Sequence, residues 1–309
     1  MKETAAKKSF WAVFENAGLG KTWASRLREW RFGFYLLWRN TLTRVSLIIV
    51  ILLILTAIFA PYIVPYPSHA ISATDPANSL LPPSAEHFFG TDEQGRDVFS
   101  RVLYGSRISL QTALLAVGLA LIIGIPLGAV AGALGGAADE IIMRITDIFL
   151  SFPPLLLSIA IAALLGPNLR NAMLAIALAW WPWYTRLIRG QAVSIKERQF
   201  VRAANAIGAS PAAIIFRHII PNCIAPVIVQ ASMDIGGTIL TISSLSFLGL
   251  GAQAPAPEWG LMINTSRNYI LNAWWYSIFP GLAIFITVLV FNLLGDGIRE
   301  ILDPKTRKV

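Results

Sequence analysis

The chain has 309 residues, of which 55% are hydrophobic and 14% are charged, and its mean hydropathy is +0.62. A water-soluble domain of this length needs more charged residues to cover its surface, so the composition indicates that lipid surrounds much of the chain. The net charge of +8 does not indicate a nucleic-acid interface, because the basic residues lie between long uncharged stretches. A single cysteine excludes an internal disulfide, and three histidines far apart in sequence give no metal-binding pattern.

Six apolar runs approach the length of about 20 residues that a helix needs to cross a bilayer. In chain order they cover residues 45–64, residues 110–133, the stretch between Asp147 and Arg170, and residues 171–188, 223–248 and 274–294. More than forty residues precede the first run, so we expect this run to remain as an anchor and not to be a cleaved signal peptide. The runs predict an all-α integral membrane protein with six transmembrane helices.

The basic residues predict the orientation, because Lys and Arg accumulate in cytoplasmic segments. Twenty of the 25 basic residues lie in residues 1–44, in the turn with Arg144, in residues 186–217 and from residue 299 onward. Placing these segments inside makes both termini cytoplasmic. Residues 1–44 are then a basic cytoplasmic segment, and residues 301–309 are a cytoplasmic tail.

The extracytoplasmic segment, residues 65–106, divides into two parts. Its first half is rich in Pro, Ser and Ala, which predicts an irregular loop. From Asp97 onward apolar residues recur at helical spacing, which predicts a short amphipathic helix lying at the membrane interface. A glycine-hinged, charged turn precedes this helix, and it is either a structural turn or a contact surface for a partner. Its residues are Gly90, Thr91, Asp92, Gly95, Arg96 and Asp97.

Residues 200–222 are too polar for a span and too apolar for an ordinary loop. Gly208 suits the end of a helix, Ser210 suits an N-cap and Pro211 suits the first position of the next helix. We therefore expect two short helices joined by a tight turn on the cytoplasmic side. Small residues line one face of the first helix, which would allow close approach to a groove on a partner protein. The alternative is a hairpin that only stabilises the chain.

Asp234 is the one carboxylate placed well inside a predicted span. A charge at that depth costs at least about 2.5 kcal/mol if it faces lipid, so it should face protein or a water-filled path. Ser243 and Ser244, farther along the same helix, could line that path or bond back to the helix backbone. Whether Asp234 lines a translocation path or is a structural residue stays open at this point.

Two local patterns predict packing within the membrane. Glycines recur every fourth residue at Gly124, Gly128, Gly132 and Gly136, which gives the second span a smooth ridge for a neighbouring helix. Arg144 and Asp147 are three residues apart and could form an ion pair at the inner edge.

No catalytic motif is evident. Gly20-Lys21-Thr22 resembles the end of a phosphate-binding loop, but Glu15 occupies the position of its first glycine. The sequence contains neither HExxH nor GxSxG, so we expect no enzyme activity and no cofactor bound by this chain. An ion-coupled secondary transporter remains an alternative, although it would be expected to carry several intramembrane charges.

Residues 200–222, FVRAANAIGASPAAIIFRHIIPN, resemble the cytoplasmic loop of permease subunits in binding-protein-dependent ABC importers, whose pattern is EAA, three residues, Gly, nine residues and I-x-L-P. Ala203, Ala204, Gly208 and Pro221 match this pattern, whereas Arg202, His218 and Ile220 replace its Glu, first Ile and Leu. Longer blocks resemble the C-type permease of peptide and nickel importers. They cover most of the chain after residue 40, at residues 87–110, 124–136, 143–153, 245–260 and 291–304.

The resemblance implies the type I ABC importer transmembrane-domain fold over residues 107–300, in a bacterial or archaeal cytoplasmic membrane. It implies a homologous B-type permease, two ATPase subunits that bind ATP and magnesium, and an extracytoplasmic substrate-binding protein that docks near residues 90–97. The implied substrates are peptides, with nickel chelates, glutathione and oligosaccharides as alternatives. The residues that it assigns to ATPase coupling are Arg202, Ala203, Ala204, Ile207, Gly208, Ala209, Ser210, Arg217 and Pro221.

Overall fold

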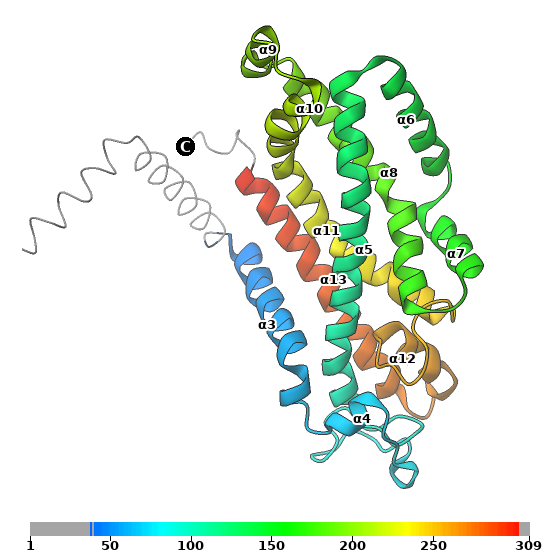
Figure 1. Cartoon of the computed structure of the whole chain (residues 1–309). Helices are drawn as coiled ribbons and strands as arrows, with labels where there is room; N and C mark the ends of the chain where they lie inside the picture. Colours follow the sequence, from blue (N-terminus) through cyan, green and yellow to red (C-terminus); the bar gives the residue numbers. More distant parts are fainter. Residues whose placement is uncertain (1–37, 39, 303–309) are drawn as a thin grey trace, which may run out of the picture.

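The computed structural model describes Trp38 and residues 40–302, and the regular elements within this part of the chain are helices (Figure 1). One isolated bridge pairs Thr91 with Asp97. Almost all of the predicted basic segment 1–44 and of the tail 301–309, together with Gly20-Lys21-Thr22, lies outside the described residues.

Four helical stretches are long and apolar enough to cross a membrane, and a bent pair of helices makes a possible fifth. The four are α3 (Thr41–Ile63), α5 (Val98–Leu134), a continuous stretch Pro211–Phe247 that contains α11 (Ile220–Phe247), and α13 (Trp274–Leu302). The bent pair is α6 (Gly136–Leu150) with α7 (Pro154–Leu165), whose axes meet at 88°. The spans predicted near 45–64, 110–133, 223–248 and 274–294 therefore correspond to long apolar helices.

The third and fourth predicted spans differ from simple transmembrane helices. Pro153 and Pro154 end α6 and start α7, because a proline has no N–H to continue the hydrogen-bond ladder. The fourth span lies within α8 (Leu169–Lys196), which is continuous through Pro182. Polar and basic residues in its second half, including Arg186 and Arg189, keep α8 outside the group of strongly apolar helices.

The expected interfacial helix is the first part of α5 and not a separate element. Asp97 caps this end, because its carboxylate accepts a hydrogen bond from the Ser100 N–H at 2.7 Å. The side chain of Trp259, at the start of α12 (Trp259–Ser266), donates to the Val102 carbonyl at 2.9 Å. This end of α5 is thus continuous with the long helix and is covered by other parts of the protein.

The predicted glycine ridge forms the contact between α5 and α8 at three of its four positions. A Cβ atom added at Gly128 would lie 2.4 Å from the Thr185 carbonyl oxygen, and comparable overlaps occur at Gly124 and Gly132. These glycines let the two backbones touch. Gly136 does not belong to this contact: it is the first residue of α6, its φ is +56°, and a Cβ atom added there would meet no neighbour within 4 Å among the described residues.

The predicted ion pair between Arg144 and Asp147 is not formed. Arg144 instead approaches Glu140, one helical turn earlier, at 3.5 Å. Asp147 pairs with Arg186 of α8. A second link, from Asp139 to Arg189 at 2.6 Å, also joins α6 to α8. Tertiary packing explains this difference, because α8 lies beside α6 and two of its guanidinium groups pair with acidic residues of α6.

Two groups of short elements lie at opposite ends of the helix bundle (Figure 1). At one end are α9 (Gln199–Ala206) and α10 (Pro211–Ile214), which precede a π-helical turn at Ile215–Ile219. At the other end are α4 (Pro67–Ile71), the 3-10 turn Pro76–Asn78, and α12 with the turn Arg267–Tyr269. The bundle thus separates a helical hairpin from a layer of loops.

Candidate functional site

The hairpin of α9 and α10 has the local geometry that its sequence predicts. Gly208 follows α9 with a φ of +81°, a left-handed conformation that glycine adopts without a steric penalty. The Ser210 hydroxyl accepts a hydrogen bond from the Ala213 N–H at 3.3 Å, and Pro211 occupies the first position of α10. Local signals in the sequence therefore account for the turn.

Most of the predicted coupling residues are exposed. The exposed ones are Arg202, Ala203, Ile207, Gly208, Ser210, Arg217 and Pro221. Ala204 is buried against the rest of the chain, and Ala209 is half-buried. Ile207 is 87% exposed and Phe216, in the π-helical turn after α10, is 69% exposed, so this region presents large apolar side chains that the described part of the chain does not cover. Such surface at the tip of a projection is typical of a protein contact.

Arg202, which stands where the resemblance expects Glu, forms an ion pair with Glu197 at the end of α8. The hydrogen bond from Arg202 is the main reason that the pKa of Glu197 lies below its usual range. Because both side chains are largely exposed, this pair contributes little to stability. Glu197 nevertheless balances part of the positive charge of Arg202 at the base of the hairpin.

Asp234 lies near the middle of α11, 14 residues after Ile220 and 13 before Phe247. At a rise of about 1.5 Å per residue, it is roughly 20 Å from either end of the helix. The Tyr184 hydroxyl donates a hydrogen bond to one carboxylate oxygen at 2.6 Å, and the Gln230 amide donates to the other at 2.9 Å. Two helices, α8 and α11, therefore hold this carboxylate in place.

The Asp234 carboxylate borders a cleft of about 290 Å³ between α8, α11 and the junction of α6 with α7. The lining residues are Leu150, Pro154, Ala179, Trp180, Trp183, Gln230 and Asp234. The cleft is mainly apolar, and Gln230 and Asp234 supply its polar side chains. We call it the Asp234 cleft.

Ser243 and Ser244 do not line this cleft. Ser243 is buried, and its hydroxyl donates to the Glu258 carboxylate at 3.3 Å. The Ser244 hydroxyl bonds back to the Leu240 carbonyl of its own helix at 2.8 Å. The structure therefore does not bring the two serines together with Asp234.

Glu258, for which the sequence analysis predicted no role, is the fully buried cap of α12. Its carboxylate accepts hydrogen bonds from the N–H groups of Gly260 at 3.0 Å and Leu261 at 2.9 Å. Burial raises the pKa of this carboxyl above its usual range, although these backbone hydrogen bonds oppose the shift. The available signal was weak: acidic residues are favoured near the start of a helix, but Glu is not one of the preferred N-cap residues.

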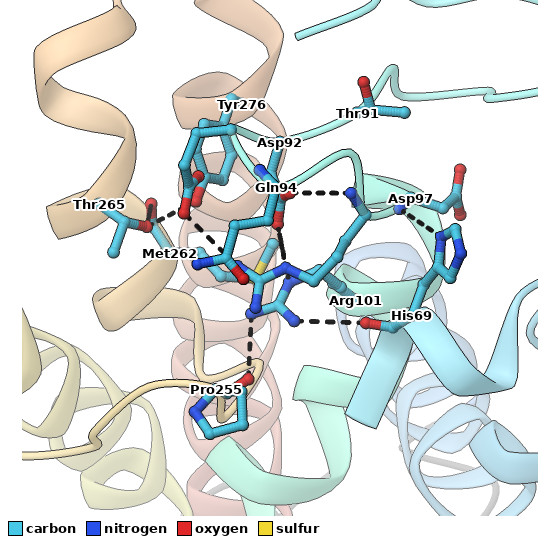
Figure 2. A network of polar contacts seen from close by, with 12 residues as sticks. His69, Thr91, Asp92, Gln94, Asp97, Arg101, Pro255, Met262, Thr265 and Tyr276 are labelled. Atoms are coloured by element: carbon cyan, nitrogen blue, oxygen red, sulfur yellow. Dashed lines mark hydrogen bonds and ion pairs between the residues drawn. The ribbon is translucent and has the colours of Figure 1, made fainter. Parts of the chain in front are cut away.

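The charged turn at residues 90–97 belongs to a buried network (Figure 2). Asp92 accepts hydrogen bonds from the backbone N–H groups of Gln94 and Arg96, each at 2.9 Å. It also pairs with the Arg96 guanidinium at 2.7 Å, and Arg101 of α5 approaches the same oxygen at 3.5 Å. One buried carboxylate thus organises the turn and the start of α5.

Arg101 connects this turn with two other loops. Figure 2 shows its guanidinium between the carbonyls of His69 and Pro255, to which it donates hydrogen bonds at 3.3 Å each. On another side, the Trp275 indole of α13 donates to the Thr91 carbonyl at 3.1 Å. The sequence alone places Arg101 only on the polar face of the expected interfacial helix, because its long-range partners leave no local signal.

All six residues predicted for binding-protein docking are buried: Gly90, Thr91, Asp92, Gly95, Arg96 and Asp97. The Asp97 carboxylate lies 3.0 Å from Nδ1 of His87, which is also buried. These side chains hold the loop layer together and leave its outer surface to neighbouring residues, among them the exposed Gln94. Within the part of the chain that the structure describes, no group of three or more His, Cys, Asp or Glu residues could hold a metal ion.

Two family models match the sequence of this chain. Residues 124–308 match the model of binding-protein-dependent transport system inner membrane components. Residues 30–83 match the N-terminal transmembrane domain of oligopeptide transport permease C, so the similarity begins earlier than the residue 40 that the sequence analysis indicated.

Curated relatives cover most of the chain. The protein is 51% identical over 282 residues to the "Probable D,D-dipeptide transport system permease protein DdpC" of Escherichia coli strain K12, and the match covers 90% of this chain and 94% of the relative. It is 50% identical to the dipeptide transport system permease protein DppC of Alkalihalophilus pseudofirmus, with 90% of each chain covered. It is 46% identical to the glutathione transport system permease protein GsiD of Pectobacterium atrosepticum, with 84% of this chain and 85% of the relative covered.

A solved structure of the MetNI methionine ABC transporter in an inward-facing conformation shares the fold. The TM-score is 0.54 at 17% sequence identity, and the match covers 65% of this chain and 96% of that chain.

Proposed function

This chain belongs to the family of binding-protein-dependent transport system inner membrane components, and we propose that it is the C-type permease of an importer for dipeptides. It would form the membrane pathway together with a homologous B-type permease. Two ATPase subunits, which bind ATP and magnesium, would drive it, and an extracytoplasmic binding protein would deliver the substrate. Glutathione is the alternative that a relative's name supports, whereas nickel chelates and oligosaccharides rest on the family resemblance alone.

We propose that the chain crosses the bacterial inner membrane six times, with both termini in the cytoplasm. The spans would be α3, α5, the bent pair α6–α7, α8, α11 and α13. Helix α8 is long enough for a span, because 28 residues extend roughly 42 Å. Its polar side chains would face protein, as its contact with the α5 glycines and its ion pairs with α6 suggest.

The observation that carries the proposal is the hairpin of α9 and α10 with its exposed apolar tip. An ordinary cytoplasmic loop would be expected to cover or omit Ile207, whereas a hairpin that enters a groove on an ATPase subunit needs this surface. The Asp234 cleft lies between the hairpin and the loop layer, and it would form part of the translocation path. The exposed surface of the loop layer would receive the binding protein.

Reconstitution with purified partner subunits tests the proposal. Proteoliposomes that contain this chain, the second permease and the ATPases should accumulate a radiolabelled dipeptide when the binding protein and ATP are present. Ile207→Asp should reduce both ATPase copurification and uptake, while the thermal stability of the solubilised permease stays unchanged. Ser210→Ala, which removes a cap inside the same hairpin, is the comparison for a purely structural defect. Uptake by this chain alone, without ATPase subunits, would instead support an ion-coupled transporter.

A further inference from the structure

The Asp234 carboxylate has hydrogen-bonding capacity that the described part of the chain does not use. An ionised carboxylate has about four acceptor positions, and Tyr184 and Gln230 fill one on each oxygen. No Lys, Arg or His side chain of the described residues forms an ion pair with Asp234. A negative charge at mid-depth in a membrane protein is normally paired or faces a water-filled cavity. This one borders an open cleft.

The walls of the Asp234 cleft favour a cation as its occupant. Trp180 and Trp183 both line it, and the face of an indole ring attracts ammonium groups. The two indole side chains and the carboxylate line the same cleft, which has a volume of about 290 Å³. Aromatic surface with one anionic acceptor is a frequent arrangement for binding an organic ammonium group, whereas small metal ions prefer several oxygen ligands.

We infer that the Asp234 cleft binds the α-ammonium group of the transported peptide. This inference rests on the proposed function, because it takes the substrate to be a peptide with a free amino terminus. The ammonium group donates hydrogen bonds to the vacant positions of the carboxylate, and the indole rings flank it. Tyr184 and Gln230 are positioning residues, since each holds one carboxylate oxygen by a single hydrogen bond.

Photolabelling in the assembled transporter tests this inference directly. The complete complex is placed in lipid nanodiscs without the binding protein, and it is irradiated with a dipeptide of alanine and photoleucine that has a free amino terminus. Unlabelled dialanine and N-acetyl-dialanine then compete for labelling of this chain. We expect dialanine to compete at about tenfold lower concentration or better, because acetylation removes the charge of the amino terminus.

Two variants on the same helix separate the carboxylate from general effects. Asp234→Asn keeps the size of the side chain and removes its charge, so the preference for dialanine should disappear. Ser232→Ala is the matched control, because the Ser232 hydroxyl bonds back to the Ile228 carbonyl of its own helix. It should behave as the unaltered chain does. If Asp234→Asn fails to assemble, the competition measured on the unaltered transporter still decides the question.

Equal competition by the two dipeptides, or an unchanged preference in Asp234→Asn, would overturn the inference. Equal competition is also the result expected if a basic residue of the second permease neutralises Asp234. The same preparation is assayed for ATP-dependent dipeptide uptake after the binding protein is added. Absence of uptake by the unaltered complex would count against the proposed dipeptide function, whereas uptake without amino-terminal preference would count against the ammonium site alone.

Discussion

The contact between α5 and α8 gives a prediction whose size can be worked out from the structure. In Gly128→Ala, the new Cβ would lie 2.4 Å from the Thr185 carbonyl oxygen and 2.8 Å from the Ile188 Cβ. Ordinary contact begins near 3.4 Å, so the two helices must separate by about 1 Å at this point. Neither neighbouring atom is the flexible end of a side chain, because one belongs to the backbone and the other is bonded to it.

We expect Gly128→Ala to reduce the free energy of unfolding by about 1–3 kcal/mol, which is the usual cost of overpacking. Gly118→Ala is a control in the same helix, because no neighbouring atom of the described residues lies within 4 Å of its added Cβ. It should be neutral or slightly stabilising, since alanine favours helix over glycine by up to about 1 kcal/mol. The measurement is the midpoint of thermal unfolding for the detergent-solubilised permease, followed by size-exclusion chromatography.

Equal midpoints for the two variants would refute the proposed close contact between α5 and α8. A loss in both variants would show that glycine is needed throughout α5 for another reason, such as helix flexibility. Gly132→Ala provides a second test at the same interface, because its Cβ would lie 2.6 Å from the Ala192 Cβ. Its destabilisation should resemble that of Gly128→Ala.

Two predictions concern the loop layer, which we propose lies outside the cytoplasm. Arg101→Met should destabilise the permease by about 3 kcal/mol, because it removes a buried guanidinium that bonds to two loop carbonyls and approaches Asp92. The resistance of the loops to protease in intact spheroplasts measures this effect. Unchanged resistance would contradict the role given to Arg101. The second prediction is that the stability of the permease depends on pH through Glu258. Folding raises the pKa of this carboxyl, so the folded state binds the proton more tightly than the unfolded state. Stability therefore falls as the pH rises above the unfolded pKa of 4.5 and through the folded pKa. The thermal midpoint of the unaltered permease relative to Glu258→Gln should therefore decrease as pH rises above 4.5, and an increase would show that the carboxylate is stabilised by folding.

Local patterns in the sequence predicted the elements whose physics is local. The apolar runs identified the four strongly apolar spans, since the cost of exposing a backbone to lipid depends on each segment alone. Gly208, Ser210 and Pro211 predicted the hairpin turn, because capping involves neighbours within a few residues. Periodicity alone could not show that Val98 starts one helix of 37 residues, whose first turns contact Trp259 of α12, a residue more than 150 positions later.

The candidate sites depended on contacts that no local pattern contains. The apolar pattern placed Asp234 inside a span, but its partner Tyr184 lies 50 residues earlier, and the aromatic walls of the cleft come from α8. Position on one helix groups Ser243 with Asp234, whereas tertiary packing directs Ser243 toward Glu258.

The sequence by itself determined that this protein is a helical membrane protein with a capped hairpin between two of its helices, because composition, periodicity and capping act over one helix or one turn. Only the tertiary structure decided which polar residues are buried and which face open space. The charged turn at residues 90–97 illustrates the difference, since its composition suits a surface and yet most of its side chains are inside. The reason is that Trp275, which bonds to the turn, and the loop around Pro255, which bonds to the neighbouring Arg101, are distant in the sequence and reach this region only when the bundle is assembled.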